Sequence, residues 1–334
     1  MNSVLKRALV ALFALFCFAY PFAVVGIAFD VHSPFSLAWA GSAFLFLEGV
    51  LLVVAAMLVY GWLRGLCAGL IVIALSYGVE ALGVGTGFPF GTYRYTDILF
   101  PNLPGSVPLA VMFAWLLIVF GVCGWLRRGK RELTIWDTLL GAILATLLDL
   151  EIEPVATHLE HYWEWQAPGR INYYGVPLAN FAAWFVVAFV LLVAMRYILA
   201  PTFNGDRSRT STSRAPARGA PTIYGEAVSR MVGAPLAGAL VAPTLVAGAL
   251  ATATPVRSPV MLAIVIPRIL YVASLFMFGL IDLTHGYYLA TVLGLLAVAI
   301  LFILSTLPDR APLAVPPADR VEQNQAFQHD GKGM

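Results

Sequence analysis

Three acidic residues lie at alternate positions in one short stretch of this sequence. They are Asp149, Glu151 and Glu153, and Pro154 follows directly. On a continuing helix Asp149 and Glu153 are four residues apart and share a face, whereas Glu151 points elsewhere. Two such carboxyl groups repel each other as anions in a low-dielectric setting, so one keeps its proton near neutral pH, the state that a general acid needs. The spacing fits equally well with two solvated carboxylates at a helix end before a proline.

A second stretch combines glycine, aromatic residues and a carboxyl group. It reads GVGTGFPFGTYRYTD over residues 83–97 and ends at Asp97. We expect its glycines and prolines to prevent a regular helix. Aromatic faces beside a carboxyl group suit an apolar substrate that receives a proton. Glu80, at the end of the apolar stretch before it, is a further candidate acid or a buried structural group.

A third stretch, HLEHYWEW over residues 158–165, continues into NYYGVPLAN over 172–180. Tyrosine and tryptophan commonly form a belt at the membrane interface, which accounts for much of this composition. His158 and His161 have a ligand-like spacing, but a chain with five histidines has too few for a membrane di-iron enzyme. The glycines of 83–87 lack the strand-turn-helix context of a dinucleotide site. We therefore expect no metal and no cofactor.

These stretches interrupt a very apolar chain. Of its 334 residues, 60% are hydrophobic and 11% are charged, which is too little charge to cover a soluble protein of this size. The composition predicts an all-α, polytopic membrane helix bundle of about eight to nine transmembrane helices with two long aromatic loops. Apolar stretches of suitable length cover residues 8–29, 35–60, 62–82, 105–126, 133–150, 176–200, 231–253, 259–281 and 285–306.

The charges between these stretches predict an orientation in the cell membrane. Basic residues gather before the first span and after every second one, so the positive-inside rule makes the N-terminus cytoplasmic. The loops 83–104 and 151–175 then share the outer face. We predict a catalytic six-helix domain over 1–200, a flexible basic cytoplasmic linker over 201–225, C-terminal membrane helices over 226–306 and a disordered tail over 307–334.

Five stretches, taken in order, resemble the membrane carotenoid biosynthesis family. The resemblance covers residues 77–199. The family's known activity is hydration of carotenoid ψ-ends, as in γ-carotene and bisanhydrobacterioruberin hydratases. The family often has aspartate where this chain has Glu153, which keeps a carboxyl group but changes its reach. The matching stretches are GTGFPFGTYRYTD (85–97), VPLAVMFAW (107–115), DLEIEP (149–154), YWEW (162–165) and YYGVPLANFAAW (173–184).

The resemblance implies a cofactor-independent hydro-lyase acting on lycopene, γ-carotene or a bisanhydrobacterioruberin-type carotenoid. A proton adds to a terminal double bond, and water captures the tertiary cation. Asp149 and Glu153 are the expected acid–base pair, and Glu80 and Asp97 are supporting or alternative acids. Aromatic faces stabilise such a cation by about 0.5–2 kcal/mol each. The residues expected to line the pocket or hold water are Phe88, Phe90, Tyr93, Tyr95, Trp115, Trp163, Trp165, Tyr173, Tyr174 and Asn180.

Two other functions share these features. A carotenoid ψ-end cyclase forms the same cation but lets an internal double bond capture it. A membrane transporter or carotenoid-binding protein would use the carboxylates to bind protons or ions, and transporters often contain paired repeats, which this sequence does not show. The expected partners are the carotenoid substrate, the lipid bilayer and other carotenoid biosynthesis enzymes. We expect no nucleic acid partner.

Overall fold

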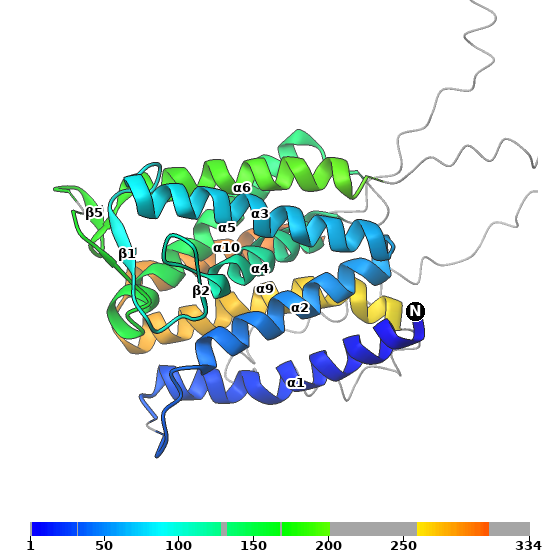
Figure 1. The fold of residues 1–334 in the computed structure, drawn as a ribbon, viewed down its shortest axis with the longest axis horizontal. Helices are drawn as coiled ribbons and strands as arrows, with labels where there is room; N and C mark the ends of the chain where they lie inside the picture. The colour runs from blue at the N-terminus through cyan, green and yellow to red at the C-terminus, as the bar shows by residue number, and fades with distance from the viewer. Residues whose placement is uncertain (1, 32, 128–131, 168, 201–258, 307–334) are drawn as a thin grey trace, which may run out of the picture.

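The computed structural model describes residues 2–31, 33–127, 132–167, 169–200 and 259–306, and these ranges form a bundle of long helices (Figure 1). The predicted linker, the predicted span 231–253 and the predicted tail lie outside the described residues. A short π-helix, η1 (Val155–Leu159), extends α5. The helices are α1 (Asn2–Ala28), α2 (Ala40–Tyr60), α3 (Trp62–Thr86), α4 (Leu109–Leu126), α5 (Ile135–Pro154), α6 (Leu178–Ile198), α9 (Pro259–Thr284) and α10 (Tyr288–Thr306).

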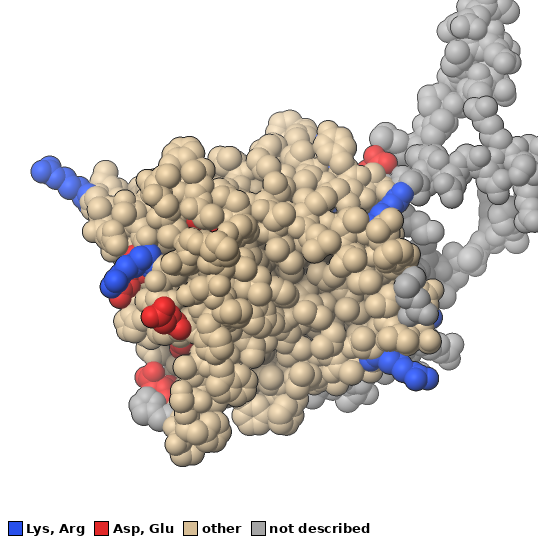
Figure 2. Space-filling model, viewed as in Figure 1, with Lys and Arg blue, Asp and Glu red and all other residues tan. Residues whose placement is uncertain are grey.

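Seven of these helices, all but α5, are long and apolar enough to cross a membrane. Figure 2 shows charged side chains at the two ends of the molecule, with an uncharged band between them on the visible face. Helix α5 carries four acidic residues and packs against α4, α6, α9 and α10. The prediction of an all-α, polytopic membrane bundle is therefore confirmed.

Helix α4 lies at the centre of the bundle. It is apolar all round, as a helix buried on every side must be, and it contacts α2, α3, α5, α6 and α9. Trp115 on α4 and Tyr271 on α9 are the largest fully buried side chains, and the Tyr271 hydroxyl donates to the Leu144 carbonyl of α5 at 2.8 Å. Helices α9 and α10 thus pack into the same core as the first six helices.

Three two-stranded antiparallel sheets lie together at one end of the bundle (Figure 1). The sequence predicts loops there and does not predict these strands. In the first sheet Tyr93 lies opposite Trp165 and Tyr95 lies opposite Trp163, so the two aromatic loops are joined to each other. The pairs are β1 (Tyr93–Tyr95) with β4 (Trp163–Trp165), β2 (Asn102–Leu103) with β3 (Val107–Pro108), and β5 (Asn172–Tyr173) with β6 (Val176–Pro177).

The expectation that the helix breaks at Gly83 is wrong. Helix α3 continues to Thr86, and the chain turns at Gly87, whose φ of 76° is in the left-handed region that favours glycine. Gly83 instead permits close packing, because a Cβ there would lie 2.8 Å from both the Phe90 ring and the Tyr93 hydroxyl oxygen. The extension keeps Glu80 inside the helix, about 9 Å below its end.

Candidate active site

The carboxyl groups of Asp149 and Glu153 lie on one face of α5. The helix starts at a capping box between Thr134 and Asp137 and stays regular to Pro154, so the two residues are one turn apart. Both are buried. The amide nitrogen of Asn180, at the start of α6, donates to Asp149 Oδ2 at 3.1 Å and to Glu153 Oε1 at 2.9 Å. One amide group therefore bridges both carboxyl groups.

Strand β4 supplies two further donors to Glu153. Because alternate residues of a strand point the same way, Trp163 and Trp165 face α5 together. Their ring nitrogens donate to Glu153 Oε2 at 3.0 and 3.1 Å. Among the described residues, Glu153 thus accepts hydrogen bonds from three N–H groups, whereas Asp149 accepts one, from Asn180. Asp149 Oδ1 is buried without a hydrogen-bond partner among the described residues.

A second buried carboxyl group, Glu80 on α3, also accepts three donors. The hydroxyls of Tyr93 and Tyr95 donate to its Oε2 at 2.7 and 2.8 Å, and the Trp115 ring nitrogen donates to its Oε1 at 3.0 Å. Burial, followed by the charge of Glu80, raises the pKa of Tyr93 and of Tyr95 above the usual range. Both tyrosines therefore remain neutral, and their hydroxyls donate hydrogen bonds to Glu80.

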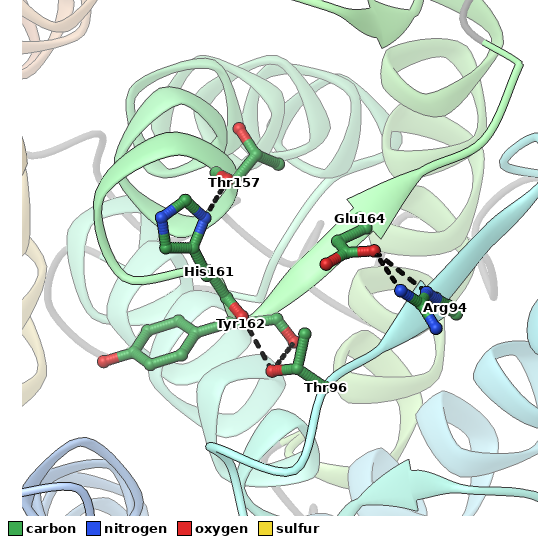
Figure 3. A network of polar contacts seen from close by, with 6 residues as sticks. All are labelled: Arg94, Thr96, Thr157, His161, Tyr162 and Glu164. Carbon is green, nitrogen blue, oxygen red and sulfur yellow. Dashed lines mark hydrogen bonds and ion pairs between the residues drawn. The ribbon is translucent and has the colours of Figure 1, made fainter.

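The paired strands β1 and β4 hold the two carboxyl sites side by side. Tyr93 packs on Trp165 with ring centroids 5.1 Å apart, and Tyr95 meets Trp163 edge-on at 6.0 Å. Figure 3 shows the outward-facing residues of the same strands, where Arg94 donates twice to Glu164 at 2.9 and 2.6 Å. The Thr96 hydroxyl next to them donates to the His161 carbonyl at 2.7 Å.

Aromatic rings and small side chains complete the wall of the site. Trp184, which sequence reasoning does not select, stacks on Trp115 at 4.0 Å. Trp184 is the last residue of the family-like stretch 173–184, and this position in the stretch could have identified it as a site residue. Phe90 is 2% exposed and packs with Tyr93 and Ala183.

An open groove of about 310 Å³ runs along the outer side of this wall. Phe88, which is 69% exposed, forms part of its rim. Ala183 and Val187 of α6 line the groove and also pack against the aromatic cluster around Tyr93. Ala183 and Val187 thus join the groove to this cluster, which we call the aromatic layer. It is lined by Phe88, Pro89, Ala179, Ala182, Ala183, Val186 and Val187.

Three of the predicted residues lie apart from this cluster. Asp97 is exposed on the loop after β1 and is not among the groups that bond to the buried carboxyls. The Tyr173 hydroxyl donates to the Leu150 carbonyl at 3.0 Å, and the Tyr174 hydroxyl accepts from the Leu289 amide at 3.3 Å. Both tyrosines therefore face the α5–α10 side of the bundle.

The two loop histidines bind separate backbone carbonyls. His158 Nε2 lies 2.8 Å from the Tyr174 carbonyl. His161 Nδ1 lies 3.1 Å from the Thr157 carbonyl, as Figure 3 shows. Within the described ranges, no group of three or more histidine, cysteine, aspartate or glutamate side chains is arranged to hold a metal ion.

Comparison with known proteins places the chain among carotenoid biosynthesis proteins. The family described as "carotenoid biosynthesis protein" matches residues 40–254. A bisanhydrobacterioruberin hydratase from Haloarcula japonica is 37% identical over 123 residues, which are 35% of this chain and 41% of the relative. The match thus spans about two-fifths of that relative's length. No solved structure gives a significant match.

Proposed function

Because the chain belongs to the carotenoid biosynthesis protein family, we propose that it is a carotenoid hydratase of the cell membrane. It would add water across a terminal ψ-end double bond and form a tertiary alcohol without a cofactor. The substrate class is lycopene, γ-carotene or a bisanhydrobacterioruberin-type carotenoid. The observation that carries the proposal is the buried pair Asp149 and Glu153, bridged by Asn180 and walled by aromatic rings.

Asp149 is the proton donor in this proposal. Hydrogen bonds from N–H groups favour the ionised form of a carboxyl group, and Glu153 receives three while Asp149 receives one. The proton of the pair therefore resides on Asp149, whose Oδ1 has no partner in the described structure. It passes to the less substituted carbon of the double bond, and the positive charge develops on the neighbouring tertiary carbon.

The surroundings then stabilise the cation. Faces of tryptophan and tyrosine attract a desolvated positive charge, by about 0.5–2 kcal/mol each. The rings of Trp163 and Trp165 stand between Glu153 and the Tyr93–Tyr95 pair. The oxygens of Glu80, which accept three hydrogen bonds, lie on the other side of the Tyr93–Tyr95 pair and add negative electrostatic potential there.

Water completes the reaction at Glu153. The water oxygen bonds to the tertiary carbon, and one of its protons passes to the Glu153 carboxylate. This proton then passes from Glu153 to Asp149, which restores the starting protonation state of the pair. Because no electrons are gained or lost, the reaction needs no redox cofactor.

The apolar remainder of the substrate would lie in the groove beside α6. This groove is lined by alanine, valine, proline and phenylalanine, and it adjoins the aromatic layer through Ala183. A long polyene can lie there within the lipid while its end group passes inward between Phe90 and α6. The bilayer and the carotenoid are therefore the partners that this arrangement requires.

Expression in a host that makes lycopene or γ-carotene, with mass spectrometry of the pigments, tests the proposal. We expect the wild-type chain to produce carotenoids heavier by the mass of water. Asp149→Asn and Glu153→Gln should each lower the yield by about 10²–10⁴-fold, the usual contribution of general acid–base catalysis. Asp30→Asn, at an exposed carboxyl group of the same end, is the control.

The products separate the possible outcomes. A product of unchanged mass with a new ring would indicate a cyclase. Unchanged alcohol yield from both normally expressed variants would remove Asp149 and Glu153 from the mechanism.

A further inference from the structure

A second pair of buried acidic side chains lies on the other side of α5. Glu151 is 1% exposed, and Asp282, near the end of α9, is fully buried. Glu151 Oε2 and both carboxyl oxygens of Asp282 have no hydrogen-bond partner among the described residues. With Asp149 Oδ1 they make up four of the five buried side-chain atoms of this kind. Buried carboxyl oxygens require donors, so the three oxygens of Glu151 and Asp282 are candidates for binding a small polar ligand.

The structure provides space for Glu151 through two glycines. Its Oε1 lies against Gly294 of α10, and a Cβ at Gly279 of α9 would be 2.9 Å from the same oxygen. A methyl group at Gly294 would overlap the carboxyl group. Gly279 lies three residues before Asp282 on α9, so the contact with Glu151 and the Asp282 side chain are on neighbouring turns of one helix face. The two acidic groups therefore share one polar site between α5, α9 and α10, which we call the Glu151 site.

Tyr173 connects the Glu151 site to the proposed proton donor. Its hydroxyl donates to the carbonyl of Leu150, the residue between Asp149 and Glu151. Burial raises the pKa of Tyr173 above its usual range, and the charges of Asp282, Tyr174, Glu151 and Asp149 add to this effect. The Tyr173 hydroxyl therefore stays protonated, and its ring packs in a cluster with Leu150 of α5 and with Ala290 and Leu293 of α10.

The Glu151 site also lies close to the exposed end of the bundle. The Tyr287 amide donates to the backbone carbonyl of Asp282 at 2.8 Å. The rings of Tyr174 and His158 pack on Tyr287, with centroids 5.2 and 5.9 Å away. Asp282 is thus connected through Tyr287 to the loop residues at this end of the bundle, on the α10 side of α5.

We infer that Glu151 and Asp282 bind the water that the reaction consumes and deliver it past Tyr173 to Asp149 and Glu153. This inference rests on the proposed hydratase function. Water is the small donor that satisfies several buried acceptors at once. The apolar groove beside α6 is unsuited to supply it. The carotenoid and the water then enter from opposite sides of α5.

The tertiary cation can react in two ways, by capture of water or by loss of a proton. When water is present, a carbon–oxygen bond forms and Glu153 takes a water proton. When water is lacking, the cation loses a proton to the Asp149 carboxylate and the double bond reforms. In deuterium oxide the second route returns an unhydrated carotenoid that carries deuterium. Glu151 and Asp282 are thus positioning residues for water and not for the proton.

The experiment uses the full chain in lipid nanodiscs, with a ψ-end carotenoid and deuterium oxide. The double variant Glu151→Met/Asp282→Leu removes the polar groups, and Glu151→Gln/Asp282→Asn keeps groups that bind water. We expect the apolar pair to lower alcohol formation by about 10–100-fold. Deuterium should then accumulate in the recovered carotenoid. The amide pair should stay close to wild type, as should the exposed control Asp30→Leu.

Three results would overturn the inference. The first is wild-type alcohol formation by the apolar pair. The second is loss of alcohol in both double variants without deuterium exchange, which would mean that the pair serves structure or the proton step. The third is inactivation of the wild-type enzyme by a chelator, with activity restored by Ca²⁺ or Mg²⁺. That result would mean that the Glu151 site binds a cation. If the wild type forms no alcohol, the proposed function fails instead.

Discussion

Glu80 illustrates how a single buried carboxyl group can organise its surroundings. Two tyrosine hydroxyls and one indole N–H, from the loop after α3 and from α4, converge on its two oxygens. Two of these donors are buried and the Tyr95 hydroxyl is half-buried, and each would lose its partner if the carboxyl group were removed. Glu80 therefore joins α3, β1 and α4, in addition to any electrostatic effect on a cation.

This arrangement predicts a large difference between two substitutions of Glu80. Glu80→Leu leaves three donors unpaired, at about 1–3 kcal/mol each, so we expect a clear fall in unfolding temperature. Glu80→Gln keeps an acceptor and should be milder. Tyr77→Phe, which removes an exposed hydrogen bond to the Pro104 carbonyl, serves as the control. Thermal unfolding in detergent measures the effect, and a Glu80→Leu variant that unfolds like the wild type would contradict the account.

The amino-acid sequence identifies the acidic side chains of the site but not the residues that donate hydrogen bonds to them. The four-residue spacing indicates that Asp149 and Glu153 share a face, and the structure places them so. Asn180 is expected to hold water, yet its amide bridges the two carboxyl groups. No spacing rule connects residue 180 to 149, because that contact depends on how α6 packs against α5.

At the scale of elements, the helices follow from apolar length and the strands do not. The apolar stretches predict α2, α4 and α9 to within a few residues of their ends. Strands of two or three residues leave no periodic pattern to detect. The pairing of Tyr93 with Trp165 is set by tertiary packing, and so is the continuation of α3 through Gly83.

Helix α6 provides an element-scale test of the groove. Ala182 lines the groove and is exposed, so Ala182→Trp should occupy the space proposed for the polyene. We expect a fall in carotenoid conversion of about tenfold or more, because the end group can no longer reach its productive position. Val190→Trp, which is 52% exposed on the same helix outside the groove, is the matched control.

Pigment yield and protein level are measured for both variants. Equal conversion by the two tryptophan variants would remove the groove from the substrate path.

For the whole molecule, the orientation in the membrane is a prediction that labelling can test. The positive-inside rule makes the N-terminus cytoplasmic, so the end that bears β1, β4 and β5 faces outward. Lys6 and Ile171 lie at opposite ends of the bundle by this assignment. We expect Ile171→Cys, at a site that is 77% exposed, to react with a membrane-impermeant maleimide in intact cells.

Lys6→Cys should react only after lysis. Both variants are made in a background without the three native cysteines, Cys17, Cys67 and Cys123. The reverse labelling pattern would invert the orientation.

In the proposed hydratase, the groove beside α6 would also set the quantity that governs turnover. In that proposal the carotenoid would enter the apolar groove from the plane of the bilayer and would not have to dissolve in water. The relevant concentration is then the number of carotenoid molecules per unit of membrane area, and the search is two-dimensional. Adding lipid at a fixed total amount of pigment would slow the enzyme by surface dilution, as a larger aqueous volume would not.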